Sequence, residues 1–339
     1  MTKLIFFDVD EKEQALLLKE FAREKAFELR LSQKHLDEHT ACIAKEARGI
    51  GIFIQSKITQ EVLDHLPMVK VIATMSTGFD HIDLKACKAR NITVCNVPSY
   101  GDNTVAEYAF CLILVLARKL KQTLERVERG LFSRNGLMGM DIKGKTLGLV
   151  GIGRIGSHMA RLGWAFGMKV IAHDLRLDVD LKEKYGVQFM TLEDVLEQAD
   201  VISLHVPYLP STHHLINTER LRLLKPTALL INTSRGKVID TKAVAAALRE
   251  NRLGGVALDT FEGEDIWIEE EFLKRDDLPA ITLKEAMESF SIMRSELAIL
   301  TPHNAFNTRE SLERILITSA ENLKAYFGGN PQNIVSGIK

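Results

Sequence analysis

The feature that most constrains this 339-residue chain is a glycine-rich turn between two apolar runs, within residues 147–174. The segment reads LGLVGIGRIGSHMARLGWAFGMKVIAHD, and Gly151, Gly153 and Gly156 stand in the spacing G-x-G-x-x-G. Asp174 follows the second apolar run, 18 residues after the last glycine. A strand, a glycine turn, a helix and a second strand that ends in an acid about 20 residues on form the fingerprint of a dinucleotide-binding unit.

Each glycine has a separate task in such a unit. Gly151 permits the tight turn, Gly153 lets the backbone approach a pyrophosphate, and Gly156 lets the helix pack close to the sheet. The free N–H groups at the start of that helix, near Arg154 and Ile155, would face the phosphates.

The acid at the end of the second strand discriminates between cofactors. The carboxylate of Asp174 can accept hydrogen bonds from the adenosine ribose hydroxyls, and it would repel a 2′-phosphate. The sequence therefore predicts NAD as the cofactor, in preference to NADP.

Composition excludes several other classes of protein. A net charge of −1 gives no electrostatic footprint for nucleic acid. The longest apolar run, 109–117, is far shorter than the roughly 20 residues of a membrane span, and 3–9 read as a strand and not as a signal peptide. The four cysteines show no zinc spacing and no CxxC pair, so we expect no metal and a cytoplasmic protein with reduced thiols.

Strand-like and helical runs alternate along both halves of the chain, which implies parallel sheets with helices on their faces. In the first half the strand-like runs are LIFFDV, GIGIFIQ, VKVIATM and ITVCNVP, separated by helical runs such as EKEQALLLKEFAREKAF. In the second half, 201–206 and 229–233 are continuous apolar runs, as in strands that are covered on both faces. We expect an α/β protein of two doubly wound parallel-sheet domains, a Rossmann NAD-binding domain and a smaller, flavodoxin-like substrate domain.

Three longer segments complete the predicted elements. Residues 103–127 read as one long helix with Asn103 as its N-cap, and the apolar residues in its middle point all round the axis, which predicts burial on several sides. Residues 308–327 form an amphipathic helix that glycines end, and 265–300 read as an inserted helical segment.

Three side chains that suit acid–base chemistry and anion binding follow successive strands of the second half. Arg235 follows LLINTS, Glu264 follows VALDTFEG, and His303 follows ILTP. Open α/β sheets bind their ligands beyond these strand ends. Arg235 offers a planar fork of donors for a carboxylate, His303 can give and take a proton near neutrality, and Glu264 could fix the tautomer of that imidazole. An ordinary strand-end arginine, a structural histidine and a solvated acid are the alternative readings.

At this point the chain resembles the D-isomer-specific 2-hydroxyacid dehydrogenases, and most closely their D-lactate dehydrogenase branch. The motifs that carry the resemblance run over nearly the whole chain: NTVAE at 103–107, the GIGRIG loop, HVP at 205–207, LKPTALLINTSRGKVID at 224–240, and TPH at 301–303. Two features depart from the common pattern. Glu264 and His303 are unusually far apart, and Asn304 replaces an apolar residue.

The resemblance implies the members of the active site. Arg235 would bind the substrate carboxylate, with Glu264 and His303 as the acid–base pair. Ser76, Thr77, Gly78 and Tyr100 would also contact the substrate. Besides the glycine-loop residues and Asp174, the residues placed near NAD would be Thr104, His205, Val206, Pro207, Thr212, Thr233, Ser234, Asp259 and His303.

The resemblance also implies the arrangement of domains and the reaction. Residues 1–101 with 306–339 would form the substrate domain, and 102–305 the NAD-binding domain. The helix from Asn103 would help to form a homodimer. The expected reaction is reduction of pyruvate to D-lactate by hydride transfer from NADH, with His303 as the acid.

Other functions remain open on the sequence alone. Glyoxylate or hydroxypyruvate would suit the same site, and so would phosphite as the substrate of a related dehydrogenase. From a different class, NAD-sensing transcriptional corepressors share the fold. Tyr100 and the long segment after Glu264 favour D-lactate.

Overall fold

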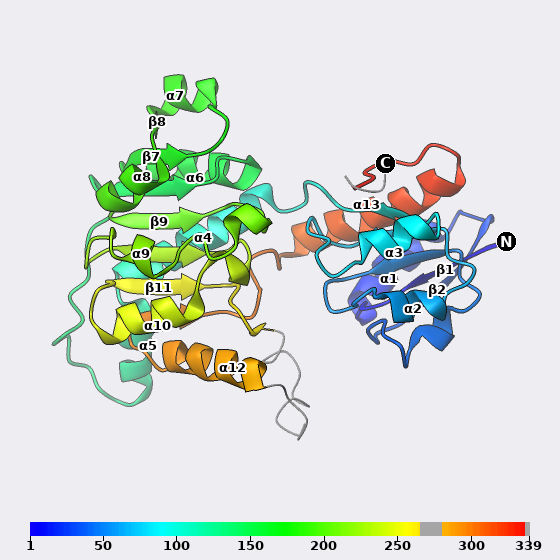
Figure 1. Cartoon of the computed structure of the whole chain (residues 1–339), viewed down its shortest axis with the longest axis horizontal. Helices are drawn as coiled ribbons and strands as arrows, with labels where there is room; N and C mark the ends of the chain where they lie inside the picture. The colour runs from blue at the N-terminus through cyan, green and yellow to red at the C-terminus, as the bar shows by residue number, and fades with distance from the viewer. Residues whose placement is uncertain (265–279, 336–339) are drawn as a thin grey trace. The chain divides into compact units, whose positions relative to one another are not determined.

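The computed structural model describes residues 1–264 and 280–335 of the chain. The chain folds into two compact units, one from Met1–Tyr100 with Asn307–Lys339 and the other from Gly101–Phe306 (Figure 1). Each unit is built on its own parallel sheet. The prediction of two parallel-sheet α/β domains is therefore confirmed.

The sheet of the first unit has five strands in the order β2-β1-β3-β4-β5, all parallel. This is the flavodoxin-like order, in which the chain reverses direction across the sheet between β1 and β3. The strands are β1 (Thr2–Phe6), β2 (Phe27–Leu31), β3 (Gly49–Ile52), β4 (Val71–Thr74) and β5 (Thr93–Cys95).

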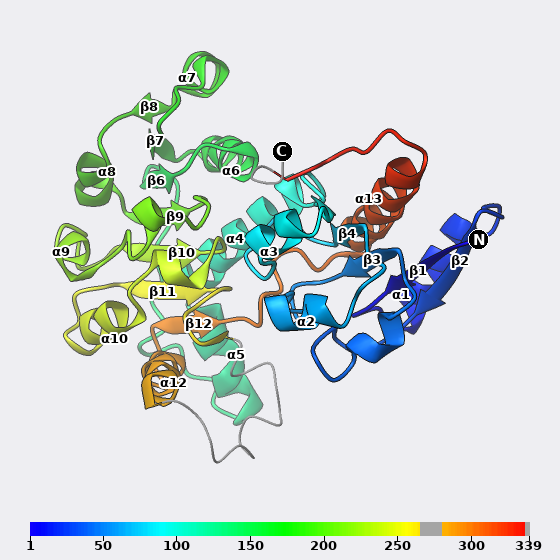
Figure 2. The ribbon, with the colours of Figure 1, turned by 45° about the vertical axis from the view of Figure 1, so that its right-hand side comes forward.

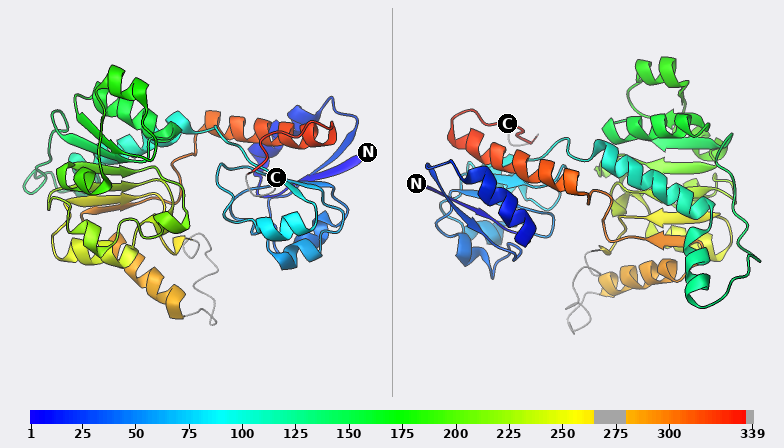
Figure 3. Two further views of the ribbon diagram at one scale, coloured as in Figure 1. Left: turned by 45° about the horizontal axis from the view of Figure 1, so that its top comes forward. Right: turned by 180° about the vertical axis from the view of Figure 1, so that it is seen from behind.

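Helices cover both faces of this sheet. Helices α1 (Glu11–Phe21) and α13 (Arg309–Phe327) lie side by side on one face, as Figure 3 shows from behind. On the other face, the 3-10 helix η1 (Ala41–Ala44), α2 (Gln60–Asp64) and α3 (Leu84–Ala89) close a core of buried aliphatic residues. The predicted C-terminal helix is thus part of the first unit, and it begins after the N-cap Thr308.

Strand β2 is one element that the sequence reading did not anticipate. The first helix was predicted over 11–27, but it ends at Phe21, and the chain pairs with β1 from Phe27 onward. The strand FELRL is at the edge of the sheet and half-exposed along its length, so it has no continuous apolar run.

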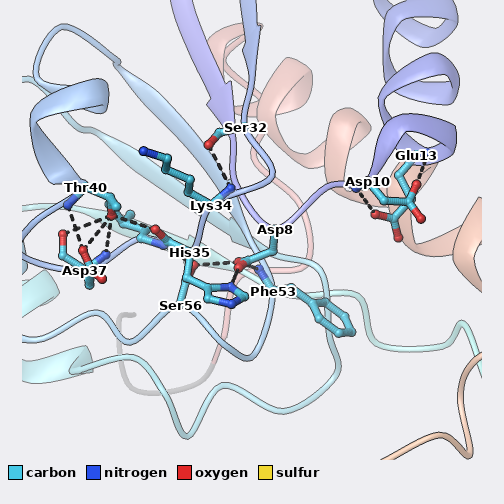
Figure 4. Close-up of polar contacts among 11 residues, drawn as sticks. Asp8, Asp10, Glu13, Ser32, Lys34, His35, Asp37, Thr40, Phe53 and Ser56 are labelled. Atoms are coloured by element: carbon cyan, nitrogen blue, oxygen red, sulfur yellow. Dashed lines mark hydrogen bonds and ion pairs between the residues drawn. The ribbon is translucent and has the colours of Figure 1, made fainter. Parts of the chain in front are cut away.

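A buried carboxylate holds the carboxyl-end loops of this sheet together (Figure 4). Asp8 follows β1 in the left-handed region at φ 60°, and its side chain is 3% exposed. It accepts hydrogen bonds from Phe53 N at 2.8 Å and Ser56 Oγ at 2.6 Å, and it pairs with His35 Nδ1. A buried carboxylate needs hydrogen-bond donors, and Asp8 receives them from the loops after β2 and β3.

The sheet of the second unit has seven parallel strands in the order β12-β11-β10-β9-β6-β7-β8. Counted from β6, the first six strands have the Rossmann order, with the reversal between β6 and β9. The strands are β6 (Thr146–Val150), β7 (Lys169–His173), β8 (Gln188–Phe189), β9 (Val201–Leu204), β10 (Leu229–Asn232), β11 (Gly255–Leu258) and β12 (Ala298–Leu300).

Two hydrophobic cores lie on opposite faces of this sheet (Figure 2). One core joins the sheet to α4 (Asp102–Ala117), α6 (Arg154–Ala165) and α7 (Val179–Tyr185). The other joins it to α8 (Leu192–Gln198), α9 (Thr218–Leu221), α10 (Thr241–Arg249) and α12 (Ala280–Met293). Of the segment 265–300 that was predicted to be helical, 265–279 lie outside the described residues, and Ala280–Met293 form α12. The prediction is wrong for Ala298–Leu300, which form β12 at the edge of the sheet.

The prediction of one long helix over 103–127 is wrong. The chain forms α4 with Gly101 as its N-cap, then turns at Lys119, which adopts φ 48°, and continues as α5 (Leu120–Glu128). The carbonyl of Ala117 accepts a hydrogen bond from Met140 N at 2.8 Å. A distant segment of chain thus binds the last turn of α4, and periodicity within the helix cannot reveal such a contact.

Candidate active site

The glycine turn between β6 and α6 has the geometry that its spacing predicts. Gly151 adopts φ 96°, and a Cβ there would lie 2.7 Å from the carbonyl oxygen of His205. A Cβ on Gly156 would lie 2.1 Å from the carbonyl oxygen of Gly151, so only glycine lets α6 begin this close to the turn. A Cβ on Gly153 would meet nothing within 4 Å, which leaves open space beside that backbone.

The start of α6 suits a dinucleotide. Gly153 is its N-cap, so no side chain covers the N–H groups of the first turn. Asp174, directly after β7, accepts hydrogen bonds from Ile152 N at 2.6 Å and Arg176 N at 2.9 Å. A carboxylate has about four lone-pair sites, so it retains acceptors for a ribose diol. Arg154, in the first turn, lies 3.4 Å from the Asp102 carboxylate.

Four polar atoms at the carboxyl edge of this sheet are buried without a hydrogen-bond partner among the described residues: His205 Nδ1, Thr233 Oγ1, Thr260 Oγ1 and Glu264 Oε2. Buried polar groups are nearly always paired, and at the strand ends where open α/β sheets bind their ligands a bound dinucleotide would supply the missing partners. His205, Thr233 and Glu264 are predicted site residues, and Thr260 is not. These features together fit a bound nicotinamide dinucleotide.

The imidazole of His205 is held neutral. Its Nε2 lies 2.9 Å from the hydroxyl of Ser203, and burial lowers the pKa of His205 to about 3. The imidazole of His205 is therefore a polar but uncharged part of the lining of the site.

The loop that carries Arg235 is held in place by the buried side-chain amide of Asn232. Asn232, at the end of β10, donates to the carbonyl oxygens of Arg235 at 3.0 Å and Thr260 at 3.2 Å. Its Oδ1 accepts from the hydroxyl of Ser234 at 2.7 Å. Gly236 approaches the backbone of Phe261 so closely that a Cβ would lie 2.3 Å away. The loops after β10 and β11 are therefore in contact.

The loop that carries His303 is organised by Asp259. This fully buried carboxylate accepts hydrogen bonds from Thr301 Oγ1 at 2.5 Å, Asn304 N at 2.8 Å and Ala305 N at 2.9 Å. His303 N in turn donates to the carbonyl oxygen of Asp259 at 3.0 Å, and His303 adopts φ 51°. The strained backbone of the histidine thus persists because bonds on both sides determine it.

These loops bring an acid and an imidazole together. Glu264 Oε1 lies 3.4 Å from His303 Nδ1, and the two side chains are 20% and 22% exposed. A carboxylate at Nδ1 favours the tautomer with the proton on Nδ1 and leaves Nε2 for a substrate. Arg235, Glu264 and His303 follow β10, β11 and β12, which are neighbours in the sheet, so they occupy one edge of the second unit.

The turn Ser76–Gly78 after β4, in the first unit, presents backbone donors. Its three carbonyl oxygens accept hydrogen bonds from Val97 N at 3.0 Å, Asn96 Nδ2 at 2.7 Å and Ser76 Oγ at 2.6 Å. No acceptor in residues 1–264 or 280–335 reaches the N–H groups of Thr77 and Gly78. Successive N–H groups of this kind form a concavity that suits an anion.

The remaining predicted site residues divide between the two units. Tyr100 is half-buried at the end of the first segment of unit one, where its carbonyl oxygen accepts from Arg314 Nε at 2.7 Å. Thr104 is buried in the first turn of α4. Thr212 donates to the carbonyl oxygen of Pro207 at 2.7 Å and so folds the loop after β9, which also contains Val206.

The sequence reading did not single out Glu262, which forms a second acid–histidine pair beside the first. Its carboxylate is 2.7 Å from His214 Nε2 and accepts from Thr241 N at 3.1 Å, which ties the loops after β9, β10 and β11. Its position two residues before Glu264 was the available signal.

Two other kinds of chemistry have little support in the described parts of the chain. No group of three His, Cys, Asp or Glu side chains there is arranged to hold a metal ion. The four cysteines are free thiols, and burial raises the pKa of Cys87 and Cys95 to about 11, which makes them poor nucleophiles. In the same residues, no helix is both long and apolar enough to span a membrane.

Comparison with known proteins gives a consistent result. The family model described as D-isomer specific 2-hydroxyacid dehydrogenase, NAD binding domain, matches residues 110–305. The 2-hydroxyacid dehydrogenase homolog 1 of Schizosaccharomyces pombe is 37% identical over 298 residues, 87% of each chain. A glyoxylate reductase of Aeropyrum pernix is 34% identical over 86% of this chain and 84% of its own. The D-lactate dehydrogenase of Aquifex aeolicus, solved with NAD and lactic acid, superposes with a TM-score of 0.86 at 37% identity over 96% of both chains.

Proposed function

This chain belongs to the D-isomer-specific 2-hydroxyacid dehydrogenases, and from that premise we propose that it reduces pyruvate to D-lactate with NADH. NAD is the cofactor of the family, and the second unit is its NAD-binding domain. The observation that carries the proposal is the distance of 3.4 Å between Glu264 Oε1 and His303 Nδ1, at the strand edge that also bears Arg235.

Binding of the substrate is assigned to its carboxylate. The guanidinium of Arg235 supplies two parallel donors, which match the two oxygens of a carboxylate. The N–H groups of Thr77 and Gly78 are the second set of donors, and Tyr100 is assigned to the methyl end of the substrate. In this proposal the substrate domain consists of residues 1–101 with 306–339, and the NAD-binding domain consists of residues 102–305.

Proton transfer is assigned to His303. When bound, the reduced nicotinamide supplies a hydride to the carbonyl carbon of the substrate. His303 Nε2 donates a proton to the carbonyl oxygen, while Glu264 holds the Nδ1 proton and stabilises the charged imidazole before the transfer. Arg235 adds positive charge beside the polarised carbonyl. In the direction of oxidation, the neutral imidazole accepts the proton.

Discrimination between NADH and NADPH is assigned to Asp174. Its carboxylate already binds Ile152 N and Arg176 N, so it is fixed at the end of β7. A 2′-phosphate would place like charges together there, which favours NADH.

We assign a homodimer to an exposed apolar face of α5 and the loop that follows. Leu120, Leu124 and Val127 are 43%, 54% and 43% exposed, and Leu131 and Phe132 are 57% and 83% exposed. Leu120, Leu124 and Val127 have the spacing of a helix-packing seam, and an exposed apolar patch of this kind marks an interaction site. A second copy of the chain supplies an identical face, as two-fold symmetric dimers require. The four free thiols suit a cytoplasmic enzyme.

A second candidate function is the reduction of glyoxylate. It is favoured by the Aeropyrum pernix relative, whose name is glyoxylate reductase. Glyoxylate lacks the methyl group of pyruvate and has the same carboxylate and carbonyl, so the proposed contacts of Arg235 and His303 would serve it equally.

A panel of 2-keto acids with the purified chain tests the proposal. Oxidation of NADH is followed with pyruvate, glyoxylate, hydroxypyruvate, 2-ketoisocaproate and phenylpyruvate, each repeated with NADPH, and phosphite is tested with NAD. We expect the highest kcat/KM with pyruvate and NADH, and D-lactate as the product. A preference for glyoxylate would select the second candidate. NAD binding without turnover of any substrate would refute the enzymatic proposal and favour an NAD sensor.

A further inference from the structure

The carboxylate-binding turn assigned above needs a fixed backbone, because N–H groups bind an anion well only when they are oriented in advance. Within the first unit, the turn Ser76–Gly78 is held by the segment that follows β5. Val97 N donates to the Ser76 carbonyl oxygen at 3.0 Å, and the Thr77 hydroxyl donates to the Val97 carbonyl oxygen at 2.8 Å.

Asn96 is the centre of this attachment. Its side-chain Nδ2 donates to the Thr77 carbonyl oxygen at 2.7 Å. Its backbone N–H donates to the Asn333 carbonyl oxygen at 3.0 Å, and its own carbonyl oxygen accepts from Asn322 Nδ2 at 2.9 Å. One asparagine is thus bound by the substrate turn, by α13 and by the C-terminal segment.

The hydrogen bonds from Asn96 continue through Asn322 to Asn333 in the C-terminal segment, and we call these three side chains the asparagine ladder. Asn322 is fully buried on α13, and its Oδ1 accepts from Asn333 Nδ2 at 2.8 Å. Around it the C-terminal chain pairs with β5, where Ile334 bridges Cys95 antiparallel and Val335 N donates to the Val94 carbonyl oxygen at 3.0 Å.

The hydrogen bonds donated by the side-chain amides all run in one direction along this ladder. Asn333 donates to Asn322, Asn322 donates to a backbone carbonyl, and Asn96 donates to the turn. Because a backbone carbonyl can only accept, the Asn322 amide has one orientation that satisfies both of its ends. An aspartate has the same shape at these positions but cannot donate.

We propose that Asn96, Asn322 and Asn333 are positioning residues that fix the turn Ser76–Gly78 for the substrate carboxylate. The inference rests on the proposed function, since it concerns how that site binds a 2-keto acid. In this proposal the three amides act through the turn and not by contact with the cofactor or the reacting atoms, so they affect substrate binding and not the chemical step. They make the C-terminal segment a determinant of substrate affinity.

The test uses steady-state kinetics of pyruvate reduction with the full chain. In Asn322→Asp the donor to Asn96 is lost, and we expect KM for pyruvate to rise about tenfold, the scale set by one lost buried hydrogen bond. The value of kcat should stay within about twofold, and the Kd of NADH should not change. Asn333→Gly removes the outer amide but keeps the left-handed backbone at φ 52°, and should raise KM about threefold.

Ser319→Ala is the matched control, because Ser319 is equally buried on α13 and its hydroxyl has no partner in the described chain. It should leave KM unchanged. If Asn322→Asp does not fold, Asn333→Gly carries the test. A KM equal to that of the wild type in the folded variants, or a fall in kcat with KM unchanged, would refute the positioning role of the ladder and leave the proposed function standing. A wild-type chain that reduces no 2-keto acid would overturn the proposed function and the ladder with it.

Discussion

At the scale of single residues, the proposed site is built around one histidine whose surroundings are specified by two acids. Asp259 fixes the backbone on both sides of His303, and Glu264 meets its imidazole. The two acids therefore divide the tasks of placing the ring and setting its tautomer. Neither task requires contact with the substrate.

Replacing His303 by glutamine separates proton transfer from cofactor binding. His303→Gln retains a polar side chain of similar size but cannot donate a proton as an acid. We expect kcat for pyruvate to fall by about 10²–10⁴-fold, the usual contribution of general acid catalysis. The Kd of NADH, measured by fluorescence titration, should change less than about threefold. Unchanged turnover would remove His303 from the acid role.

The neutral state of His205 has a consequence for stability. Its pKa is lowered to about 3, below the ordinary value near 6.5, so between these values the unfolded chain binds a proton that the folded chain does not. The free energy of unfolding should therefore fall as the pH drops from about 6.5 towards 3, by up to about 1.4 kcal/mol per pH unit from this group.

Urea denaturation at pH 7 and pH 5 measures this effect. His205→Gln should lose less stability between the two pH values than the wild type does. His39→Gln is the control, because the side chain of His39 is 86% exposed. Equal pH dependence in His205→Gln and the wild type would contradict a buried neutral imidazole.

At the scale of elements, Gly153 and Gly156 have different roles at the start of α6. A Cβ on Gly156 would meet the Gly151 carbonyl oxygen at 2.1 Å, whereas a Cβ on Gly153 would meet nothing within 4 Å. Gly156 serves the packing of the helix, and Gly153 leaves room for a ligand.

A pair of alanine variants tests this division. Gly156→Ala should destabilise the protein by about 1–3 kcal/mol, the usual cost of overpacking. The free energy of unfolding of Gly153→Ala should lie within about 0.5 kcal/mol of the wild-type value. The same variant should bind NADH at least about tenfold more weakly, because its methyl group occupies the space of the pyrophosphate. Thermal unfolding and NADH titration are the two measurements. Normal NADH affinity in Gly153→Ala would show that the phosphates lie elsewhere.

Elements with a continuous pattern could be predicted from the sequence, and elements specified by distant contacts could not. The runs at 201–206 and 229–233 contain the central strands β9 and β10, in which every residue is buried. Strand β2 lacks such a run because it is at the edge of its sheet. At the break after Ala117, the carbonyl oxygen of Ala117 accepts a hydrogen bond from Met140 N, 23 residues further along the chain.

The same distinction applies to the site. The spacing of the glycines and the strand-end positions of Arg235, Glu264 and His303 are local signals, so the sequence indicated them. Asn96, Asn322 and Asn333 are far apart in the chain, and none belongs to a motif with a known spacing. Only the fold reveals that they are neighbours.

At the scale of the whole molecule, association is predicted to depend on the exposed face of α5. Leu124→Glu places a charge in that face and should convert a dimer into a monomer, as measured by sedimentation equilibrium. Leu18→Glu is the matched control, because Leu18 on α1 is 56% exposed, close to the 54% of Leu124. A wild type that is monomeric at micromolar concentration, or a Leu124→Glu variant that still dimerises, would refute this interface.

The central claim is that Arg235, Glu264 and His303 act on one 2-keto acid beside the nicotinamide. A crystal structure with NADH and oxamate, a non-reactive isostere of pyruvate, measures this directly. We predict that the oxamate carboxylate accepts hydrogen bonds from the Arg235 guanidinium, and that its carbonyl oxygen lies within hydrogen-bond distance of His303 Nε2. Oxamate bound away from both side chains in the presence of NADH would contradict the account.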